Sequence, residues 1–554
     1  MTPRSAGTFV LPGRRLLALL AVLVGLFAAT LLWAAPASAH ATVTASDPAD
    51  GSRLTSAPTA VSISFDEPVG LGGVGYLNVT DQTGKRVDGG AAGYAGSNQA
   101  TIRVPLAEGL GDGTYTASFR VVSADSHPIA GTIRFVVGDG ALVRGSVSES
   151  SGNLGSATLL DVLRWVSFTG FALLGGVWVV LTLWPQGRTD PRSRRLLWGG
   201  WGITAFGAVT EVLMQGPYSA GSSPAHAFDP SLIDSTLHSH FGQWHIVRLV
   251  LLAVLGLVFA RSLRPDASRN RWEGVVALLG IGLAASFSSI GHPGTTAPTG
   301  LSIPVDLAHL LAMSVWVGGL IMLVGAVLPR REPSELSAVV PVFSTVAFVA
   351  IVVLAVTGTY SAWRGIGTVD AILTTTYGLL VIGKVVLFIA LLALANLSRK
   401  TVRRALSHPV ATERLRRSVY VESLAALVVL ALTAVLVAEP RGNEALAAQY
   451  RQPISASATL GAGRMLTVTS DPGTHGEVNL TVDVSAGPTP TSITAGATQI
   501  DKEIGPVPVT LTRAGGRTFS GSAPLTVAGR WRISVVVTTS EFDAVTADVT
   551  LDLH

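Results

Sequence analysis

Eight apolar segments, each close to the roughly 20 residues that cross a bilayer, fill the middle of this 554-residue chain. Only 13% of its residues are charged, about half the share found in soluble proteins. The sequence therefore predicts an eight-helix transmembrane domain over residues 158–440. Its spans are expected near residues 158–184, 196–216, 243–263, 272–290, 303–328, 338–362, 372–397 and 418–438.

The lysines and arginines between these segments orient the predicted domain. Seventeen lie in the loops on one side and a single one, Arg364, lies on the other. Positively charged loops stay in the cytoplasm, and an even number of spans returns the chain to the side it started from. We therefore expect a multi-pass protein of the cytoplasmic membrane with both flanking regions outside the cytoplasm. The basic pI of about 9.5 reflects this topology and does not indicate a nucleic-acid partner.

The first 39 residues predict an export signal. Arg14 and Arg15 precede an apolar run over residues 16–33, and Ala37-Ser38-Ala39 supplies the small residues that signal peptidase requires. Cleavage there makes His40 the first residue of the mature chain. Because the apolar run is long for a cleaved signal, its retention as a membrane anchor stays an alternative.

Two all-β regions, residues 40–138 and 450–554, flank the predicted membrane domain. Both alternate apolar and polar residues in short stretches separated by Gly, Pro, Asp and Asn, a pattern typical of antiparallel β-sandwiches. The Gly/Ser-rich residues 139–157 predict a linker. Strands are expected at residues 61–65, 75–79, 101–104, 115–122 and 132–137 in the first region and at 465–468, 477–484, 507–511, 531–537 and 545–551 in the second.

The absence of cysteine narrows the chemistry of the chain. It excludes disulfides, Cys-ligated zinc or iron–sulfur sites, thiol catalysis and blue-copper centres. A metal would need His, Met, carboxylate or backbone ligands, and of eleven histidines only His408 lies in a predicted cytoplasmic loop. This distribution favours an outward-facing metal role over the alternative of histidines in ordinary solvated loops. No nucleotide-binding loop occurs, so ATP is not an expected partner.

The first β-region carries the best-defined candidate metal ligands. Signal cleavage would free the α-amine of His40, which together with its imidazole forms a nitrogen-rich chelate suited to tetragonal Cu(II). Asp125 and His127 are two residues apart in an extended segment, so their side chains share a face. This triplet is a weak signal by itself, because His127 could simply end a strand before Pro128.

Candidate ligands also occur at or within the predicted spans. His309 and Met313 are four residues apart and share a helix face, which suggests a relay with a thioether suited to Cu(I). Glu211 and Met214, three apart, form a second candidate pair, and His292 lies at the outer end of a span. For both methionines the alternative is ordinary packing in the core.

Other ionisable residues are expected to have simpler roles. Lys384 near mid-span and Glu422 near the cytoplasmic end of its span are costly unless paired, but their depths differ too much for a direct bridge. Arg248, near the outer surface, is expected to snorkel or to serve topology. The histidine-containing loop 217–242, with the nearby His245, either collects metal or is simply solvated.

Residues 40–138 resemble the CopC copper-binding family. The resemblance implies a Cu(II) site formed by the His40 amine and imidazole, Asp125 and His127, and Glu67 matches a position that contributes in some members. No Met occurs between residues 2 and 213, so the Met-rich Cu(I) loop of certain relatives is missing. The matching stretches are His40-Ala41, Ser46-Asp47-Pro48-Ala49-Asp50-Gly51, Ala57-Pro58, Phe65-Asp66-Glu67, Gly113-Thr114-Tyr115 and residues 123–131.

Residues 158–440 resemble CopD, and the order of domains is similar to that of YcnJ-like CopC–CopD fusions, which are assigned to copper acquisition. The resemblance implies copper ions, the lipid bilayer and extracytoplasmic copper chaperones as partners. The matching stretches are Gly291-His292, His309 with Trp316-Val317-Gly318-Gly319, residues 357–362, and residues 415–419 with Glu422.

Together these features predict a non-enzymatic protein that binds Cu(II) outside the membrane and transports or delivers copper across it, in copper homeostasis or resistance. Uptake is favoured only by the fusion resemblance. One alternative is a transmembrane haem-b electron-transfer protein, since helix-borne histidines can ligate haem. Another is a copper-dependent oxidative enzyme, since an N-terminal histidine also chelates copper in copper oxygenases.

Overall fold

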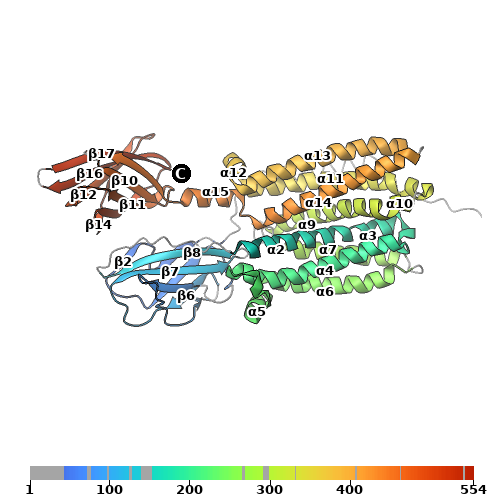
Figure 1. Cartoon of the computed structure of the whole chain (residues 1–554), viewed down its shortest axis with the longest axis horizontal. Helices are drawn as coiled ribbons and strands as arrows, with labels where there is room; N and C mark the ends of the chain where they lie inside the picture. The colour runs from blue at the N-terminus through green and yellow to red at the C-terminus, as the bar shows by residue number, and fades with distance from the viewer. Residues whose placement is uncertain are drawn as a thin grey trace, which may run out of the picture.

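The computed structural model consists of a β-sandwich at each end of the chain and a helical bundle between them. Both β-domains lie at the same end of the bundle (Figure 1). The predicted order of sandwich, helices and β-sheets is therefore confirmed. The structure describes residues 41, 43–71, 77–96, 99–123, 128–138, 153–264, 269–290, 299–330, 332–405, 409–461, 463–540 and 543–554.

The first sandwich has two four-stranded sheets, ordered β1-β3-β6-β5 and β2-β8-β7-β4. Their alternating apolar residues meet in one core, in which the Phe65 and Phe119 rings from opposite sheets lie 5.7 Å apart. The strands are β1 (Val43–Asp47), β2 (Ser52–Leu54), β3 (Ala60–Phe65), β4 (Leu77–Asp81), β5 (Gly93–Tyr94), β6 (Thr101–Pro105), β7 (Gly113–Val122) and β8 (Pro128–Val137).

The bundle contains seven described helices that are long and apolar enough to span a membrane. The fourth predicted span, residues 272–290, corresponds to a shorter apolar helix over Trp272–Ser288. The first span begins at Leu154, four residues inside the range predicted as linker. The helical segments are α2 (Leu154–Leu174), α3 (Gly176–Trp178), η1 (Val179–Leu183), η2 (Pro185–Arg188), α4 (Pro191–Ala220), η3 (Pro224–Phe228), α5 (Pro230–His238), α6 (His240–Ser262), α7 (Arg269–Ser288), α9 (Thr299–Met322), η4 (Leu323–Val327), α10 (Leu328–Arg330), α11 (Pro333–Ile366), α12 (Val369–Thr374), α13 (Thr376–Ala405), α14 (Pro409–Ala438) and α15 (Gly442–Arg451).

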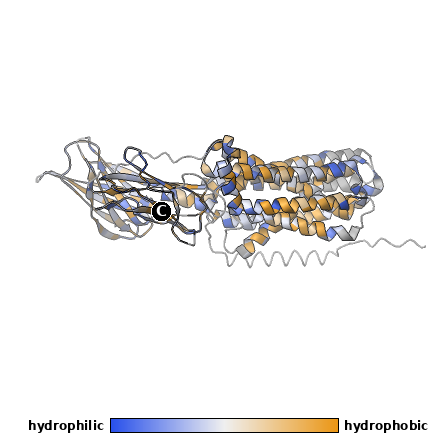
Figure 2. Ribbon diagram, turned by 90° about the horizontal axis from the view of Figure 1, so that it is seen from below, coloured by the Kyte–Doolittle hydropathy of each residue, from blue (hydrophilic) through white to orange (hydrophobic). Residues whose placement is uncertain are grey.

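Hydrophobic residues are spread over the bundle, whereas the β-domains show mixed colouring (Figure 2). Phe206, Leu257 and Leu278 have more than half of their surface exposed. A bundle that is apolar on the outside as well as the inside suits a lipid environment. This distribution indicates a membrane protein.

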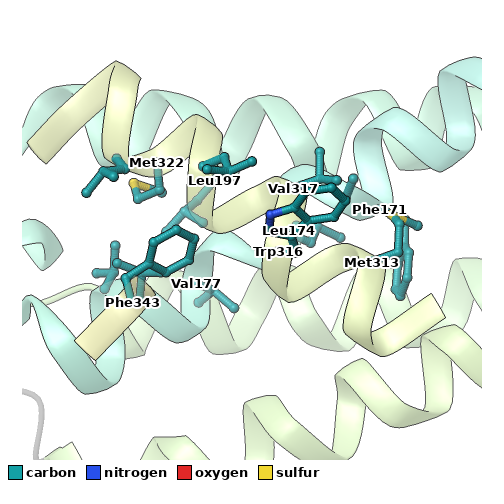
Figure 3. Packing of buried hydrophobic residues seen from close by; sticks show 14 of the residues in the cluster. Phe171, Leu174, Val177, Leu197, Met313, Trp316, Val317, Met322 and Phe343 are labelled. Atoms are coloured by element: carbon teal, nitrogen blue, oxygen red, sulfur yellow. The ribbon is translucent and has the colours of Figure 1, made fainter. Parts of the chain in front are cut away.

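Helix α9 lies inside the bundle, where it packs against α2, α7, α11 and α14. Its Met313, Trp316, Val317 and Met322 belong to one large apolar cluster (Figure 3). A Cβ atom on Gly318 would lie only 2.1 Å from the carbonyl oxygen of Ala172 in α2. The close approach of α2 and α9 therefore requires a glycine at this position, as is common where helices pack in membranes.

The Gly318→Ala substitution is expected to destabilise the bundle by about 1–3 kcal/mol, because the added methyl group forces α2 and α9 apart. Thermal unfolding of the purified protein in detergent measures this change. Gly383→Ala is the matched control, because a Cβ there meets no atom within 4 Å. The control should be neutral or slightly stabilising, since alanine favours helix more than glycine does. Equal stability of the two variants would contradict the packing argument.

The C-terminal domain has two sheets around one core, ordered β14-β15-β11-β10-β9 and β13-β12-β16-β17. Trp531 is 1% exposed in this core, and helix α15 connects the domain to the bundle (Figure 1). The strands are β9 (Ile454–Thr459), β10 (Met465–Asp471), β11 (Gly476–Val484), β12 (Ser492–Gln499), β13 (Ile504–Val509), β14 (Thr512–Gly515), β15 (Thr518–Leu525), β16 (Gly529–Ser540) and β17 (Asp543–Leu553).

Candidate functional site

The described residues that flank the expected Cu(II) ligands in the sequence lie together at one end of the first sandwich. Val43 pairs with Phe65 at the end of β3, two residues before Glu67. Gly70 and Val122 exchange backbone hydrogen bonds of 2.6 and 2.9 Å, and Val122 pairs with the first residue of β8. Glu67 is partly exposed at this end. The other expected ligands, His40, Asp125 and His127, lie outside the described residues.

The same end of the sandwich contacts the bundle through Arg120 of β7. Its Nε donates to the carbonyl oxygen of Ser219 at 2.6 Å, and its Nη2 donates to that of Tyr218 at 3.3 Å. These carbonyls belong to the last turn of α4, the negative end of the helix dipole. Gly221 then ends the helix in the left-handed conformation, with φ of 66°. Burial lowers the pKa of Arg120, as expected for a guanidinium taken out of water.

A buried polar cluster joins α2, α4 and α6 in the half of the bundle nearer the first β-domain. Glu211 of α4 accepts a hydrogen bond from Ser167 of α2. Its Oε2 lies 3.0 Å from Nε2 of His245 and 3.7 Å from Nη1 of Arg248, both on α6. These three ionisable residues are at most 4% exposed. The structure thus places two oppositely charged groups and an imidazole in direct contact inside the bundle.

Arg248 does not snorkel, contrary to the sequence-based expectation. Its guanidinium donates to the hydroxyl and the carbonyl oxygen of Ser286 in α7, at 3.2 and 2.9 Å, and lies 3.6 Å from the centre of the Phe287 ring. With the Glu211 carboxylate nearby, the arginine has partners inside the bundle and does not need to reach the surface.

The structure gives Glu211 and Met214 different partners. The Glu211 side chain is engaged by Ser167 and His245. Met214 instead packs in a separate apolar cluster with Leu160 and Leu163 of α2. Two positions three apart lie about 60° away from each other around a helix, which is enough for their side chains to meet different neighbours. We therefore leave both residues out of the proposed copper route.

A second polar group surrounds His309 on α9. Its Nδ1 lies 2.8 Å from the hydroxyl of Thr357 on α11. Lys384 of α13 interacts electrostatically with both His309 and Asp306. Sequence reasoning did not identify Asp306, and it included Thr357 only in a stretch that resembles CopD. The signal that could have found Asp306 is its depth, because it lies about as many residues inside α9 as Lys384 lies inside α13.

The remaining predicted site residues are not gathered into a metal centre. Met313, one turn after His309, is 7% exposed in the apolar cluster (Figure 3). His292 lies outside the described residues. In the described part of the chain, no three His, Asp or Glu side chains converge in a way that could hold a metal ion. His238 pairs with Asp234 on an exposed surface instead.

His245 is a poor haem ligand, because both of its ring nitrogens have partners. Nδ1 lies 2.9 Å from the carbonyl oxygen of Phe241, and Nε2 faces Glu211. An axial ligand needs one free ring nitrogen. This geometry gives no support to the haem alternative at this position.

Three family descriptions match different parts of the chain. Residues 43–138 match the CopC domain, residues 155–301 match the copper resistance protein D-like N-terminal domain, and residues 337–436 match copper resistance protein D. A copper transport protein of Bacillus subtilis, CutJ, is 30% identical over 396 residues, which cover 68% of this chain and 71% of the relative. The chain belongs to the CopC–CopD fusion family.

Shorter relatives of this CopC–CopD fusion cover its first domain. The copper resistance protein C of Pseudomonas syringae pv. tomato is 36% identical over 21% of this chain and 93% of its own length. The solved CopC structure from Methylosinus trichosporium OB3b is 26% identical and covers 18% of this chain and 95% of that one, with a TM-score of 0.16.

The two buried polar groups occupy different positions relative to the residue ranges that match the family descriptions. Glu211, His245 and Arg248 all lie within the copper resistance protein D-like N-terminal domain. Lys384 lies within the copper resistance protein D match, whereas Asp306 and His309 fall between the two matches. The first group is therefore internal to one family domain, whereas the second joins the copper resistance protein D match to the segment that precedes it.

Proposed function

We propose that this CopC–CopD fusion binds Cu(II) outside the cytoplasmic membrane and transports copper across it, with uptake as the favoured direction. The proposed Cu(II) ligands are the amine and imidazole of His40, with Asp125 and His127, and with Glu67 beside them. The observation that carries this proposal is the contact of Arg120 with the last turn of α4. It joins the bundle to the end of the sandwich at which the described neighbours of these ligands meet.

The proposed route into the membrane starts at His292 and continues through His309 and Met313. The contact of His309 Nδ1 with Thr357 fixes the orientation of the ring, so Nε2 is the nitrogen that would meet a metal ion. Met313 lies one turn further inward, and its thioether favours Cu(I). Passage as Cu(I) requires one electron from a reductant outside the membrane. Asp306 offsets the charge of Lys384, which would otherwise repel a copper ion at His309.

Copper uptake into lipid vesicles that contain the purified full chain tests this function. We expect copper to accumulate in the vesicles when a reductant is present outside. The His309→Ala variant should lose most of this accumulation, whereas His475→Ala, in the C-terminal domain, should keep it. Absence of uptake by the parent chain would overturn the transport proposal, as would unchanged cell copper after gene deletion under copper limitation.

The docking contact gives a separate prediction. Arg120→Ala removes two charge-assisted hydrogen bonds, each worth about 1.5–3 kcal/mol, and should therefore release the sandwich from α4. Amide hydrogen exchange of residues 216–221 measures this release and should become faster. Arg103→Ala, at an exposed position of β6 in the same sandwich, is the control and should leave the exchange unchanged. Unchanged protection in the Arg120→Ala variant would show that other contacts hold the two domains together.

A further inference from the structure

The contact between Glu211 and His245 can accommodate one exchangeable proton. His245 Nδ1 faces the carbonyl oxygen of Phe241, so this nitrogen carries hydrogen and donates it. In a neutral ring, Nε2 then has only a lone pair, and it faces Oε2 of Glu211 at 3.0 Å. Arg248 Nη1 can donate to this bare nitrogen at 3.2 Å, but the direct contact between the carboxylate and the nitrogen has no hydrogen of its own. One added proton, on either atom, completes the hydrogen bond.

Arg248 sets the charge of this group. Its guanidinium is always protonated, and its Nη1 lies 3.2 Å from His245 Nε2. Without the shared proton, Arg248 and the Glu211 carboxylate give a net charge of zero. With the proton, the group carries one positive charge, whether the proton is on oxygen or on nitrogen. The cluster therefore has two states that differ by one proton.

The arginine also favours a proton over a copper ion at this position. A metal bound to Nε2 would lie within a few ångströms of the guanidinium, and the repulsion between two cations is strong where water is excluded. Because Arg248 Nη1 directly contacts Nε2 of His245, we place the copper route at His309 and not at this group.

A stripe of polar residues on α4 leads from this group toward the outer surface. Glu211, Gln215 and Ser219 are spaced by four residues and share one helix face. All three are buried, and Gln215 Nε2 donates to the hydroxyl of Ser219 at 3.2 Å. The carbonyl of Ser219 accepts the hydrogen bond from Arg120 of the sandwich. The stripe therefore ends beneath the docked first domain.

The charged groups on neighbouring elements do not compete for this proton. On α2, Ser167 donates to Glu211, while Asp161 and Arg164 pair with each other at 3.2 Å. On α7, Ser286 accepts from Arg248. The charges that act on Glu211 in the described structure are those of His245 and Arg248.

We propose that Glu211 and His245 form a one-proton site inside the bundle, with Arg248 as its fixed positive charge and with Gln215 and Ser219 as its path to the outer face. A proton taken up from outside binds between Oε2 and Nε2, and it leaves by the same path when the site is emptied. Where the chain transports copper as proposed above, this site couples proton movement to that transport, and this last part alone rests on the proposed function.

Infrared difference spectra of the full chain in lipid vesicles, recorded without copper from acid to alkaline pH, test the proton site. The parent chain should show a pH-dependent band of a buried protonated carboxyl group or a matching imidazolium signal. Glu211→Gln should lose this signal. Glu422→Gln, which changes another buried carboxyl group within a span, should keep it. Retention of the signal in Glu211→Gln, or its absence from the parent chain at every pH, would overturn the proposal.

Two further variants keep the test decisive if Glu211→Gln fails to fold. Ser167→Ala removes the hydroxyl donor to Oε1 and should shift the signal without abolishing it. Gln215→Leu should keep the infrared signal. After transfer into heavy water, however, the frequency shift that accompanies exchange of hydrogen for deuterium should be slower than in the parent chain. An unchanged signal in the first variant would refute the assignment to Glu211, and an unchanged rate in the second would refute the path.

A vesicle assay with copper then separates the two proposals. Copper uptake with a coupled pH change in the parent chain, and without that change in Glu211→Gln, supports coupling. Copper uptake with no pH change overturns coupling. Absence of copper uptake in a chain that shows the infrared signal counts against the transport function and leaves the proton site standing.

Discussion

The His127→Ala variant of the full chain is expected to bind Cu(II) at least about 100-fold more weakly than the parent chain. Changes to residues that only support a ligand typically lower metal affinity by 10–100-fold, so loss of a direct ligand should exceed that range. Competition with a chelator of known affinity measures the change. The proposed site has few nitrogen donors, and His127 supplies one that the His40 chelate cannot replace.

The control for this variant is His475→Ala in the C-terminal domain. His475 Nδ1 lies 2.8 Å from the backbone carbonyl of His554, which gives it a structural role away from the proposed copper site. Its substitution should leave Cu(II) affinity unchanged. A similar affinity in the parent chain and in His127→Ala would remove His127 from the ligand set. N-terminal sequencing of the mature protein then shows whether the His40 amine is free to bind.

Hydropathy predicted the helical domain well because a bilayer requires long apolar segments. All eight predicted spans coincide with helices, although α7 has a shorter apolar segment than the others. The predicted first and last residues of the spans were less accurate. The seventh span was expected from residue 372, but α12 ends at Thr374 and α13 begins at Thr376.

The β-domains were predicted only where large apolar residues alternate with polar ones. Strand β16 was expected because Trp531, Ile533 and Val535 alternate with other residues, of which the first two are polar. Strands β9 and β12 were missed, since their buried or half-buried positions are largely alanine and glycine. Small residues give little contrast with serine and threonine, so only pairing with neighbouring strands reveals such strands.

The membrane polar groups were the least predictable part of the candidate site. Sequence spacing identified neighbours on one helix, such as His309 and Met313, but the decisive contacts join different helices. The depth of each ionisable residue within its predicted span is the sequence signal that could have identified these contacts. Asp306 lies seven residues inside α9 and Lys384 lies eight residues inside α13, which corresponds to depths of about 11 and about 12 Å. Helix rotation, which sequence alone does not give, decides which of these groups meet.

The contact of Glu211 with Arg248 gives the largest expected effect on stability. Arg248→Met is expected to destabilise the folded chain by about 3–5 kcal/mol, because it leaves the Glu211 carboxylate buried without its positive partner. It also removes the contact with the Phe287 ring. Unfolding in mixed detergent micelles, followed by tryptophan fluorescence, measures the loss. Arg261→Met, at an exposed position of the same helix, is the control and should change stability little.

A second substitution distinguishes a charge effect from a packing effect. In the double variant Arg248→Met with Glu211→Met, neither buried charge is left unpaired, so most of the lost stability should return. If the double variant is as unstable as the sum of the two single variants, packing of the arginine side chain accounts for the loss. That outcome would contradict a charge-coupled cluster, because coupled charges give non-additive changes in the free energy of unfolding.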